Sequence, residues 1–279
     1  MIKLGREYEL DVVKEMDFGF FLDAENLGEI LLPRKLAPKG LQVGDFIVVF
    51  LYLDSEDRPV ATPQKAKARV GEFAYLKVKD VSKVGAFLDW GLDKDLLVPF
   101  GEQHRPMEVG HSYLVYLYIN EADGRIVASS KVDKFIDEQK SHNFKPKQAV
   151  DLIIANSTEL GFKAIINHSH WGVLYKDEVQ QRLSFGQYVK GYIKNIRPDG
   201  KIDLMLHSSK EKLDKNASII KTYLEKHSGY AKFHDKSDPR DIYKAFGLSK
   251  AAFKKAIGNL YKQQIILIEK EGIRLKDQK

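Results

Sequence analysis

Three stretches of the chain share one pattern: FGFFLDAENLGEILLP (Phe18–Pro33), VGAFLDWGLDKDLLVP (Val84–Pro99) and LGFKAIINHSHWGVLY (Leu160–Tyr175). Each has glycine in its second position, and another glycine follows 25 residues later. The pairs are Gly19 and Gly44, Gly85 and Gly110, and Gly161 and Gly186. The same spacing in three places is typical of an internal repeat. The sequence therefore predicts three copies of one small fold.

The residues after each second glycine predict strands. They read FIVVFLYL (Phe46–Leu53), SYLVYLYI (Ser112–Ile119) and YVKGYIKN (Tyr188–Asn195). In the second and third repeats an Asp-Gly turn, at Asp123 and Asp199, then leads into a last strand, as in a tight hairpin. Repeats of about 65–75 residues with roughly five short strands are typical of small closed barrels.

After Ser218 the apolar residues recur at helical spacing. Asp238 and Pro239 predict the start of a helix, because Asp caps helix N-termini and Pro suits the first turn. Ser249 likewise begins a predicted helix over Ser249–Gln264, with Phe253, Ile257, Leu260 and Tyr261 on its buried face. IILIEKEGIRLKD then predicts a hairpin turning at Glu271 and Gly272. Three helices and a hairpin are the order of a winged helix-turn-helix.

The predicted fold class is therefore a mainly β, multidomain chain with a C-terminal α+β winged helix. Small closed barrels are expected at residues 1–64, 65–135 and 146–212, and the winged helix at 216–279. The third repeat starts about ten residues late, and KVDKFIDEQKSHNFKP (Lys131–Pro146) predicts a short helical or irregular linker.

Composition excludes several classes of protein. The chain has no cysteine, which excludes disulfides and cysteine-ligated zinc. Its longest apolar run, Phe46–Leu53, is far shorter than the ~20 residues of a membrane span. The N-terminal residues contain no apolar stretch of signal-peptide length. We expect a cytoplasmic protein with no membrane partner and no cofactor.

Positive charge rises toward the C-terminus. The net charge, counted as Lys and Arg minus Asp and Glu, is −5 over residues 1–64, 0 over 65–140, +4 over 141–217 and +7 over 218–279. A polyanion is attracted to the basic part of a protein. The C-terminal half is therefore the predicted nucleic-acid-binding half.

The repeats resemble the S-one-type RNA-binding barrel, an oligonucleotide-binding (OB) fold. The resemblance lies in the aromatic–Gly–x–aromatic strand, the later Val-Gly-Asp/His and a closing Asp/Asn followed by Arg-Ile. Three such barrels followed by LSKAAFKKAIGNLYKQQII (Leu248–Ile266) are similar to the conserved virulence factor B family of bacterial RNA-binding regulators. The resemblance implies RNA binding and effects on transcript levels, and it does not imply catalysis.

The family's RNA-contact positions match this chain unevenly. Repeat one has Phe18 and Phe21, with Asp54 and Arg58 at the closing pair. Repeat two has Val84 in place of the first aromatic, and keeps Phe87, Asn120 and Arg125. Repeat three has Leu160 and Lys163, with Lys201 in place of the arginine. The position of the family's histidine holds Pro33, Pro99 and Tyr175. The secondary RNA-binding candidates are Phe18, Phe21, Arg58, Phe87 and Arg125.

Strand alternation selects the third repeat as the main site. The outward phase after the second glycine is Phe46, Val48 and Phe50 in repeat one, and Leu114, Tyr116 and Tyr118 in repeat two, which predicts packing between barrels. In repeat three that phase alternates tyrosine with lysine, as suits bases and phosphates of a single strand. The candidates in this barrel are Lys163, Trp171, Tyr175, Tyr188, Lys190, Tyr192, Lys194, Arg197 and Lys201.

In the winged helix, the expected nucleic-acid face lies opposite Phe253, Ile257 and Leu260. It consists of Lys250, Lys254, Lys255, Asn259 and Lys262 on the helix and Arg274 in the wing, with Lys276 beside it. A basic face of this kind provides phosphate contacts without specifying a base.

No motif supports an active site, and no enzyme is predicted. His168 and His170 have no third ligand group near them, so no metal site is expected. The acidic runs Asp54–Asp57 and Asp93–Asp95 are interpreted as turn residues. The expected partner is single-stranded RNA, with no small-molecule substrate. Two alternatives stay open: a duplex-DNA-binding transcriptional regulator, and a scaffold associated with the ribosome or with proteins.

Overall fold

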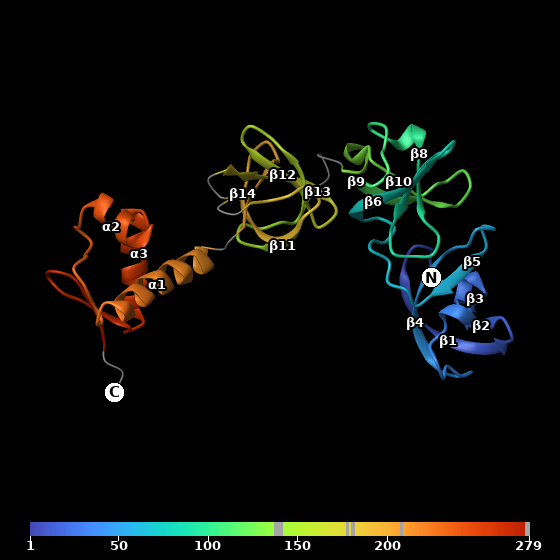
Figure 1. Ribbon diagram of the computed structural model, residues 1–279, viewed down its shortest axis with the longest axis horizontal. Coiled ribbons are helices and arrows are strands. Elements are labelled where there is room, and N and C mark those ends of the chain that lie inside the picture. Colours follow the sequence, from blue (N-terminus) through green and yellow to red (C-terminus); the bar gives the residue numbers. More distant parts are fainter. Residues whose placement is uncertain (137–141, 177–178, 180–181, 207–208, 277–279) are drawn as a thin grey trace. The chain divides into compact units, whose positions relative to one another are not determined.

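The computed structural model describes residues 1–136, 142–176, 179, 182–206 and 209–276. It divides into two compact units, residues 1–204 and 205–279. The first unit consists of three barrels made almost entirely of strands, and the second is mainly helical (Figure 1). The predicted fold class is confirmed. The domain boundaries given above stay a prediction, and the linker residues 137–141 lie outside the described residues.

Each barrel has five strands. Barrel 1 consists of β1 (Glu7–Met16), β2 (Gly19–Asp23), β3 (Glu29–Pro33), β4 (Phe46–Leu53) and β5 (Pro59–Thr62). Barrel 2 consists of β6 (Phe73–Ser82), β7 (Gly85–Asp89), β8 (Leu96–Pro99), β9 (Ser112–Ile119) and β10 (Ile126–Ser129). Barrel 3 consists of β11 (Ala149–Ser157), β12 (Gly161–Ile166), β13 (His170–Tyr175), β14 (Tyr188–Ile196) and β15 (Ile202–Met205). Short 3-10 turns η1 (Glu25–Leu27), η2 (Arg34–Leu36), η3 (Phe100–Glu102) and η4 (Val132–Phe135) join some of them.

All three barrels close in the same order. In barrel 1 the neighbours are β1, β2, β3, β5 and β4, and the other two barrels repeat this order. The third strand pairs in parallel with the last strand each time, as Leu31 does with Val60 and Leu97 with Val127. The first strand also has an irregular register at one place in each barrel, for instance between Val78 and Asp80. The three sequence repeats are therefore three copies of one closed topology.

The repeated glycine that begins the second strand has a steric cause. A Cβ at Gly85 would lie 2.2 Å from the carbonyl oxygen of Val98, and one at Gly161 would lie 2.0 Å from that of Leu174. Both distances are far below a normal contact. The strand pairing at this end of the barrel thus requires a residue without a side chain, which explains why the glycine recurs.

The inward phase of the strands was predicted correctly, but the outward phase only in part. Val49, Leu51, Val115, Leu117 and Ile193 are buried in the barrels. Phe50, on the outward phase of β4, is 1% exposed and its ring meets Trp90 of barrel 2 edge to face at 5.6 Å.

Leu114 and Tyr116 likewise pack in an apolar cluster between barrels 2 and 3. The prediction of inter-barrel packing was wrong for Phe46 and Val48, which are 68% and 58% exposed. Those two side chains lie at the start of β4, where no neighbouring barrel covers the strand.

The second unit has the elements of a winged helix. Its helices are α1 (Ser209–Lys226), α2 (Pro239–Phe246) and α3 (Lys250–Lys262), and its small sheet contains β16 (Tyr230–Ala231), β18 (Ile273–Leu275) and β17 (Ile266–Ile268) in that order. The predicted caps are confirmed: Asp238 accepts a hydrogen bond from the Arg240 amide (2.8 Å), and Ser249 accepts one from the Ala252 amide (3.2 Å). The short strand β16 was not predicted.

The core of this unit consists of residues from all three helices and the hairpin. Ile220, Leu224, Ile242, Phe253 and Ile257 are 2% exposed or less. Tyr261, predicted to share the buried face of α3, is 53% exposed, because it lies one residue past Leu260 near the end of the helix, where the stripe has rotated toward solvent. In the described part of the chain, no helix is long and apolar enough to cross a membrane.

Candidate nucleic-acid interface

A groove on barrel 3 brings together three of the predicted RNA-binding residues. It measures about 410 Å³ and is lined by Lys163 on β12, Trp171 on β13 and Lys201 in the turn before β15. Lys163 pairs across the sheet with Val173, and Trp171 lies two residues before Val173. Because side chains alternate along a strand, Lys163 and Trp171 share one face of this hairpin.

Lys163 is held over the indole ring. Its Nζ lies 3.9 Å from the centroid of Trp171 and 3.3 Å from the carboxylate of Asp133, which is 79% exposed. A pair with so exposed a partner contributes little to stability, so a phosphate is able to displace the carboxylate. Lys201 pairs in the same way with Asp199, at 3.3 Å. The groove therefore combines an aromatic face with two cations in weak pairs.

Leu160, which was not among the predicted RNA-binding residues, also lines this groove. Leu160 lies at the family's first aromatic position and is 65% exposed. Its side chain adds apolar surface to the lining that also contains Trp171. The only signal in the sequence was that an apolar residue stands at a contact position, which does not distinguish a binding surface from a core.

Tyr175 and Arg197 lie in the same barrel, but not in the lining of this groove. Arg197 donates to the carboxylate of Asp203 from Nε (2.9 Å) and Nη2 (2.7 Å), and its guanidinium lies 5.7 Å from the ring of Tyr175. The Tyr175 hydroxyl also faces Asp203, at 3.4 Å. Because Asp203 is mostly buried, this pair holds the end of β13 against β15, and the RNA role of Tyr175 and Arg197 stays a prediction.

The tyrosine–lysine alternation on β14 lines a different part of barrel 3. Tyr188 and Lys190 border a cavity of about 650 Å³ on the β11–β14 side, and Lys190 is ion-paired with Asp151. Tyr192 is half-buried and Lys194 is exposed. The structure thus separates these predicted residues from Lys163, Trp171 and Lys201.

Tyr188 also contacts the neighbouring barrel. Its hydroxyl donates to the carbonyl oxygen of Phe73 (3.1 Å), and the amide of Phe73 donates to Nδ1 of His168 (2.9 Å). Two side chains of barrel 3 therefore hold the peptide groups on both sides of one fully buried residue of barrel 2. Burial raises the pKa of Tyr188 and lowers the pKa of His168. These contacts dock barrel 3 on barrel 2.

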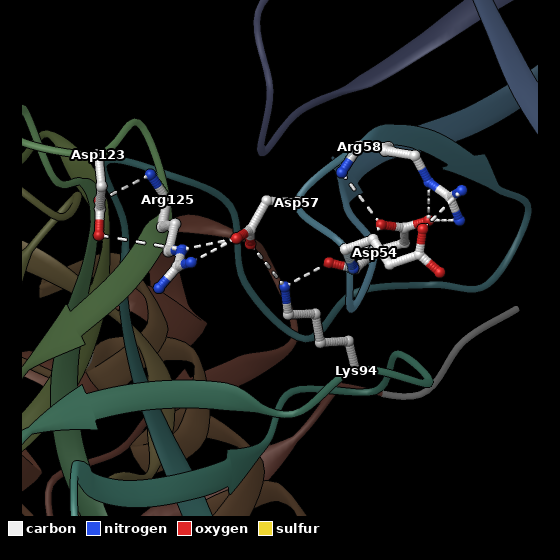
Figure 2. A network of polar contacts seen from close by, with 7 residues as sticks. Asp54, Asp57, Arg58, Lys94, Asp123 and Arg125 are labelled. Atoms are coloured by element: carbon white, nitrogen blue, oxygen red, sulfur yellow. Dashed lines mark hydrogen bonds and ion pairs between the residues drawn. The ribbon is translucent and has the colours of Figure 1, made fainter.

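Acidic partners surround the candidate arginines of barrels 1 and 2 (Figure 2). Arg58 pairs with Asp54 through Nε (2.9 Å) and Nη2 (2.7 Å). Arg125 of barrel 2 donates to Asp57 of barrel 1, and its Nε–Oδ2 distance is 3.0 Å. Lys94 joins the two groups by contacting both Asp57 and the Asp54 carbonyl oxygen.

These partners change what the two arginines are able to do. Hydrogen bonds from Arg125, opposed in part by desolvation, hold the pKa of Asp57 below its ordinary value, so the carboxylate stays charged at neutral pH. A phosphate must therefore compete with a fixed carboxylate for Arg125. Asp54 also accepts the amides of Glu56 and Arg58, as expected for a turn residue.

Phe87 borders a cavity of about 580 Å³ between barrels 1 and 2. Four carboxylates line it, against two cations, Lys94 and Arg125; they are Asp57, Asp80, Asp93 and Asp95. An acidic cavity repels phosphate. In barrel 1, Phe18 and Phe21 meet edge to face at 6.1 Å, and Lys14 lies 5.6 Å from the Phe21 ring.

The predicted polar face of the winged helix is largely exposed. Lys254, Lys255 and Lys262 of α3 are exposed, whereas Lys250 and Asn259 are half-buried. Lys254 lies 3.9 Å from Asp235. Arg274 on β18 donates to Glu269 (2.8 Å) and lies 4.7 Å from the ring of Tyr230. The exposed lysines of α3 are therefore accessible for phosphate contacts, whereas Arg274 of the wing is hydrogen-bonded to Glu269.

Family models match this architecture. A model of the S1 domain matches residues 4–64 and 70–131, and a model of the CvfB-like winged helix domain matches residues 218–275. Both are nucleic-acid-binding kinds of domain rather than enzymes. The third barrel has the same strand order as the first two, although the S1 model matches only those two.

Similar proteins cover almost the whole chain. A Bacillus subtilis protein, the uncharacterized protein YitL, is 30% identical over 92% of this chain and 89% of its own. Conserved virulence factor B of Staphylococcus aureus is 28% identical over 84% of this chain and 81% of its own.

A solved structure, a multidomain protein with nucleic acid binding domains from Streptococcus pneumoniae, is 25% identical over 98% of each chain, with a TM-score of 0.40. The coverage, the matched domains and their order lead to one conclusion: this chain belongs to the conserved virulence factor B family.

Proposed function

We propose that the protein binds single-stranded RNA through the groove on barrel 3, with the winged helix adding phosphate contacts, and that it regulates gene expression after transcription. The observation that carries the proposal is the placement of the Lys163 ammonium over Trp171, with Lys201 in the same groove. The family resemblance implies the regulatory role. We propose no chemical reaction on the RNA.

The groove suits a single strand for a physical reason. An unpaired base has two free faces, and stacking on an aromatic side chain contributes about 1–3 kcal/mol. Trp171 is half-buried and the Lys163 ammonium lies over its ring, so a base that stacks there must displace this ammonium. The displaced Lys163, together with Lys201 in the same groove, is then available to the phosphates that flank the base. A duplex hides its base faces inside the stack, so this groove favours RNA without secondary structure.

The exposed lysines of α3 support duplex DNA as a second candidate ligand. In winged helix-turn-helix proteins this helix lies in the position that enters a major groove. Lys254, Lys255 and Lys262 provide exposed positive charge, whereas Asn259, the amide on this face that suits an adenine edge, is half-buried. We therefore assign α3 to phosphate contacts, and a competition experiment tests the alternative.

The test is binding of a labelled, unstructured RNA to the full chain across a range of salt concentrations. Trp171→Ala is expected to weaken binding roughly 5- to 100-fold through lost stacking. The double variant Lys163→Glu with Lys201→Glu is expected to weaken binding by a similar factor. It is also expected to reduce the slope of log K against log salt by about 1.4, because two phosphate contacts on a single strand account for that much of the slope.

The matched control reverses two exposed lysines outside the groove, Lys39→Glu with Lys65→Glu, which changes the net charge by the same amount. This control is expected to weaken RNA binding by less than about threefold. Charges outside the groove act on the RNA only by long-range attraction, which salt screens. Equal losses in the two double variants would show that the groove is not the site. Stronger competition by duplex DNA than by RNA would favour the second candidate.

A further inference from the structure

A second cleft lies next to the groove, between barrels 2 and 3. It measures about 560 Å³ and opens on the side of barrel 2 that carries Arg105 and Lys131. Lys163 and Trp171 line both the groove and this cleft. The two hollows therefore share one lysine and one tryptophan in their linings.

The lining of the cleft matches that of a single-strand binding track. Its cations are Arg105, Lys131 and Lys163, with His104 beside them and Asp133 as the one carboxylate in the described lining. Its aromatic side chains come from both barrels: Tyr75 and Tyr113 from barrel 2, and Trp171 and Phe185 from barrel 3. Aromatic faces interleaved with cations suit stacked bases and a phosphate chain.

Several of these side chains are held in place yet accessible. Arg105 is exposed and its guanidinium lies 5.5 Å from the ring of Tyr113, while Lys131 donates to the Gly101 carbonyl oxygen (2.6 Å). Phe185 is 52% exposed, so its ring is accessible to a ligand. The ring of Tyr75 lies against Gly186, where even a Cβ would be 2.0 Å from the ring.

The walls of the cleft are joined by specific contacts. The two hydrogen bonds to Phe73, from Tyr188 and to His168, cross from barrel 3 to barrel 2. Phe73, Ile136, Ile153 and Ile165 form a buried apolar cluster at the same junction. Because both barrels supply the lining, the cleft exists only while they are docked.

We propose that one RNA strand binds the groove of barrel 3 and continues past Trp171 and Lys163 into the cleft between barrels 2 and 3. This inference rests on the proposed function and extends it. Barrel 2 contributes to binding through this side surface, not through the positions at which the family places its RNA contacts. The bound segment is then longer than the part of the strand that the groove alone holds.

The proposal is tested with the full chain and two unstructured RNAs. The shorter has about 4 nucleotides, the lower end of the range that one OB barrel covers, and the longer has about 12, so that it extends beyond a minimal site in the groove. Arg105→Ala and, separately, Phe185→Ala are expected to weaken the longer RNA about fivefold and to leave the shorter RNA within twofold. Lys39→Ala, an exposed cation of barrel 1, is the control and is expected to affect neither. Thermal unfolding checks that each variant folds.

The outcomes separate this inference from the proposed function. If Trp171→Ala weakens both RNAs while Arg105→Ala and Phe185→Ala weaken neither, the groove binds RNA and the cleft does not. If Trp171→Ala also leaves the binding of both RNAs unchanged, the groove is not the RNA site. The proposed function is then contradicted, and with it the inference that rests on it. If Arg105→Ala and Phe185→Ala weaken the short and long RNAs equally, the cleft does not bind the additional nucleotides of the longer RNA. That result would contradict the inference.

Discussion

Barrel 2 forms one cleft with each of its neighbours, and the two clefts have nearly the same size but opposite charge. The cleft toward barrel 1 measures about 580 Å³ and has four carboxylates against two cations. The cleft toward barrel 3 measures about 560 Å³ and has three Lys or Arg side chains against one carboxylate. Both contain aromatic residues, so shape and aromatic content do not separate them.

We infer from this contrast that charge decides which of the two clefts is suited to a nucleic acid. In the first cleft, the arginine at the family's contact position, Arg125, is neutralised by Asp57 of the next barrel. In the second, Arg105 faces a tyrosine ring and remains exposed. Phosphate contacts dominate nucleic-acid affinity, so Arg105, which has no carboxylate partner among the residues that the structure describes, is the arginine available to bind.

The largest expected effect concerns the junction of the acidic cleft. Phe50→Ala removes a fully buried ring that packs on Trp90 and is expected to cost about 3–5 kcal/mol of stability. RNA affinity at a temperature where the variant is folded is expected to stay within about twofold, because the proposed RNA site lies elsewhere, in the groove of barrel 3 and the cleft beside it. Urea unfolding and RNA titration measure the two effects. A folded variant with much weaker RNA binding would break the comparison.

The next effect concerns the junction of the basic cleft. His168→Ala leaves the buried amide of Phe73 without an acceptor, which is expected to cost about 1–3 kcal/mol. Hydrogen exchange of the Phe73 amide measures this loss directly. His168→Asn keeps an acceptor at a residue whose φ is 53°, a conformation that Asn tolerates, and is expected to restore much of the protection.

The same contact is expected to depend on pH. Burial lowers the pKa of His168 below its ordinary value of 6.5, although the charges of Glu72 and Asp151 oppose this. As the pH falls below about 6.5 the unfolded chain takes up the proton first, so the stabilisation present at higher pH declines until the pKa of the folded state is passed.

Protection of the Phe73 amide, compared at about pH 7.5 and about pH 5.5 after correction for the intrinsic exchange rate, is expected to fall at the lower pH. His168→Asn is expected to remove this dependence. Exposed His111 provides a control, since His111→Ala should leave the dependence intact. A dependence that persists in His168→Asn would assign it to another group.

The smallest effect tests whether the acidic cleft is a latent RNA site. Asp80→Lys places a cation in its lining and is expected to raise RNA affinity only about twofold at low ionic strength, by long-range attraction that added salt screens. Glu29→Lys, an exposed site on β3, makes the same change of charge elsewhere and should match it. A tenfold gain specific to Asp80→Lys would show that only charge keeps RNA out.

Local patterns predicted the fold well. The glycine spacing, the alternation of the strands and the caps at Asp238 and Ser249 all rely on residues close together in the chain, and the structure confirms them. Tyr261 shows the limit of such local patterns. An apolar stripe on a helix does not indicate how far the neighbouring elements extend to cover it. Phe46 and Val48 show the same limit for a strand.

The binding surfaces were harder to predict. Lys163, Trp171 and Lys201 were predicted as RNA-binding residues of one barrel, and the structure places them in one groove, while their role in binding stays a prediction. Tyr188 was selected from strand alternation, which identifies an outward side chain but not what covers it. Arg105 and Phe185 belong to no motif, and they line one cleft only because two barrels dock.

The sequence by itself determined the three repeated barrels, the winged helix and the rise of positive charge toward the C-terminus, because strand period, turn chemistry and helix caps act over a few residues. Only the tertiary structure decided which outward side chains are covered and which cations already have a carboxylate. Arg125 and Asp57 are 68 positions apart, and Phe73 and His168 are 95 apart. Contacts over such distances depend on how barrels pack, and no local pattern encodes them.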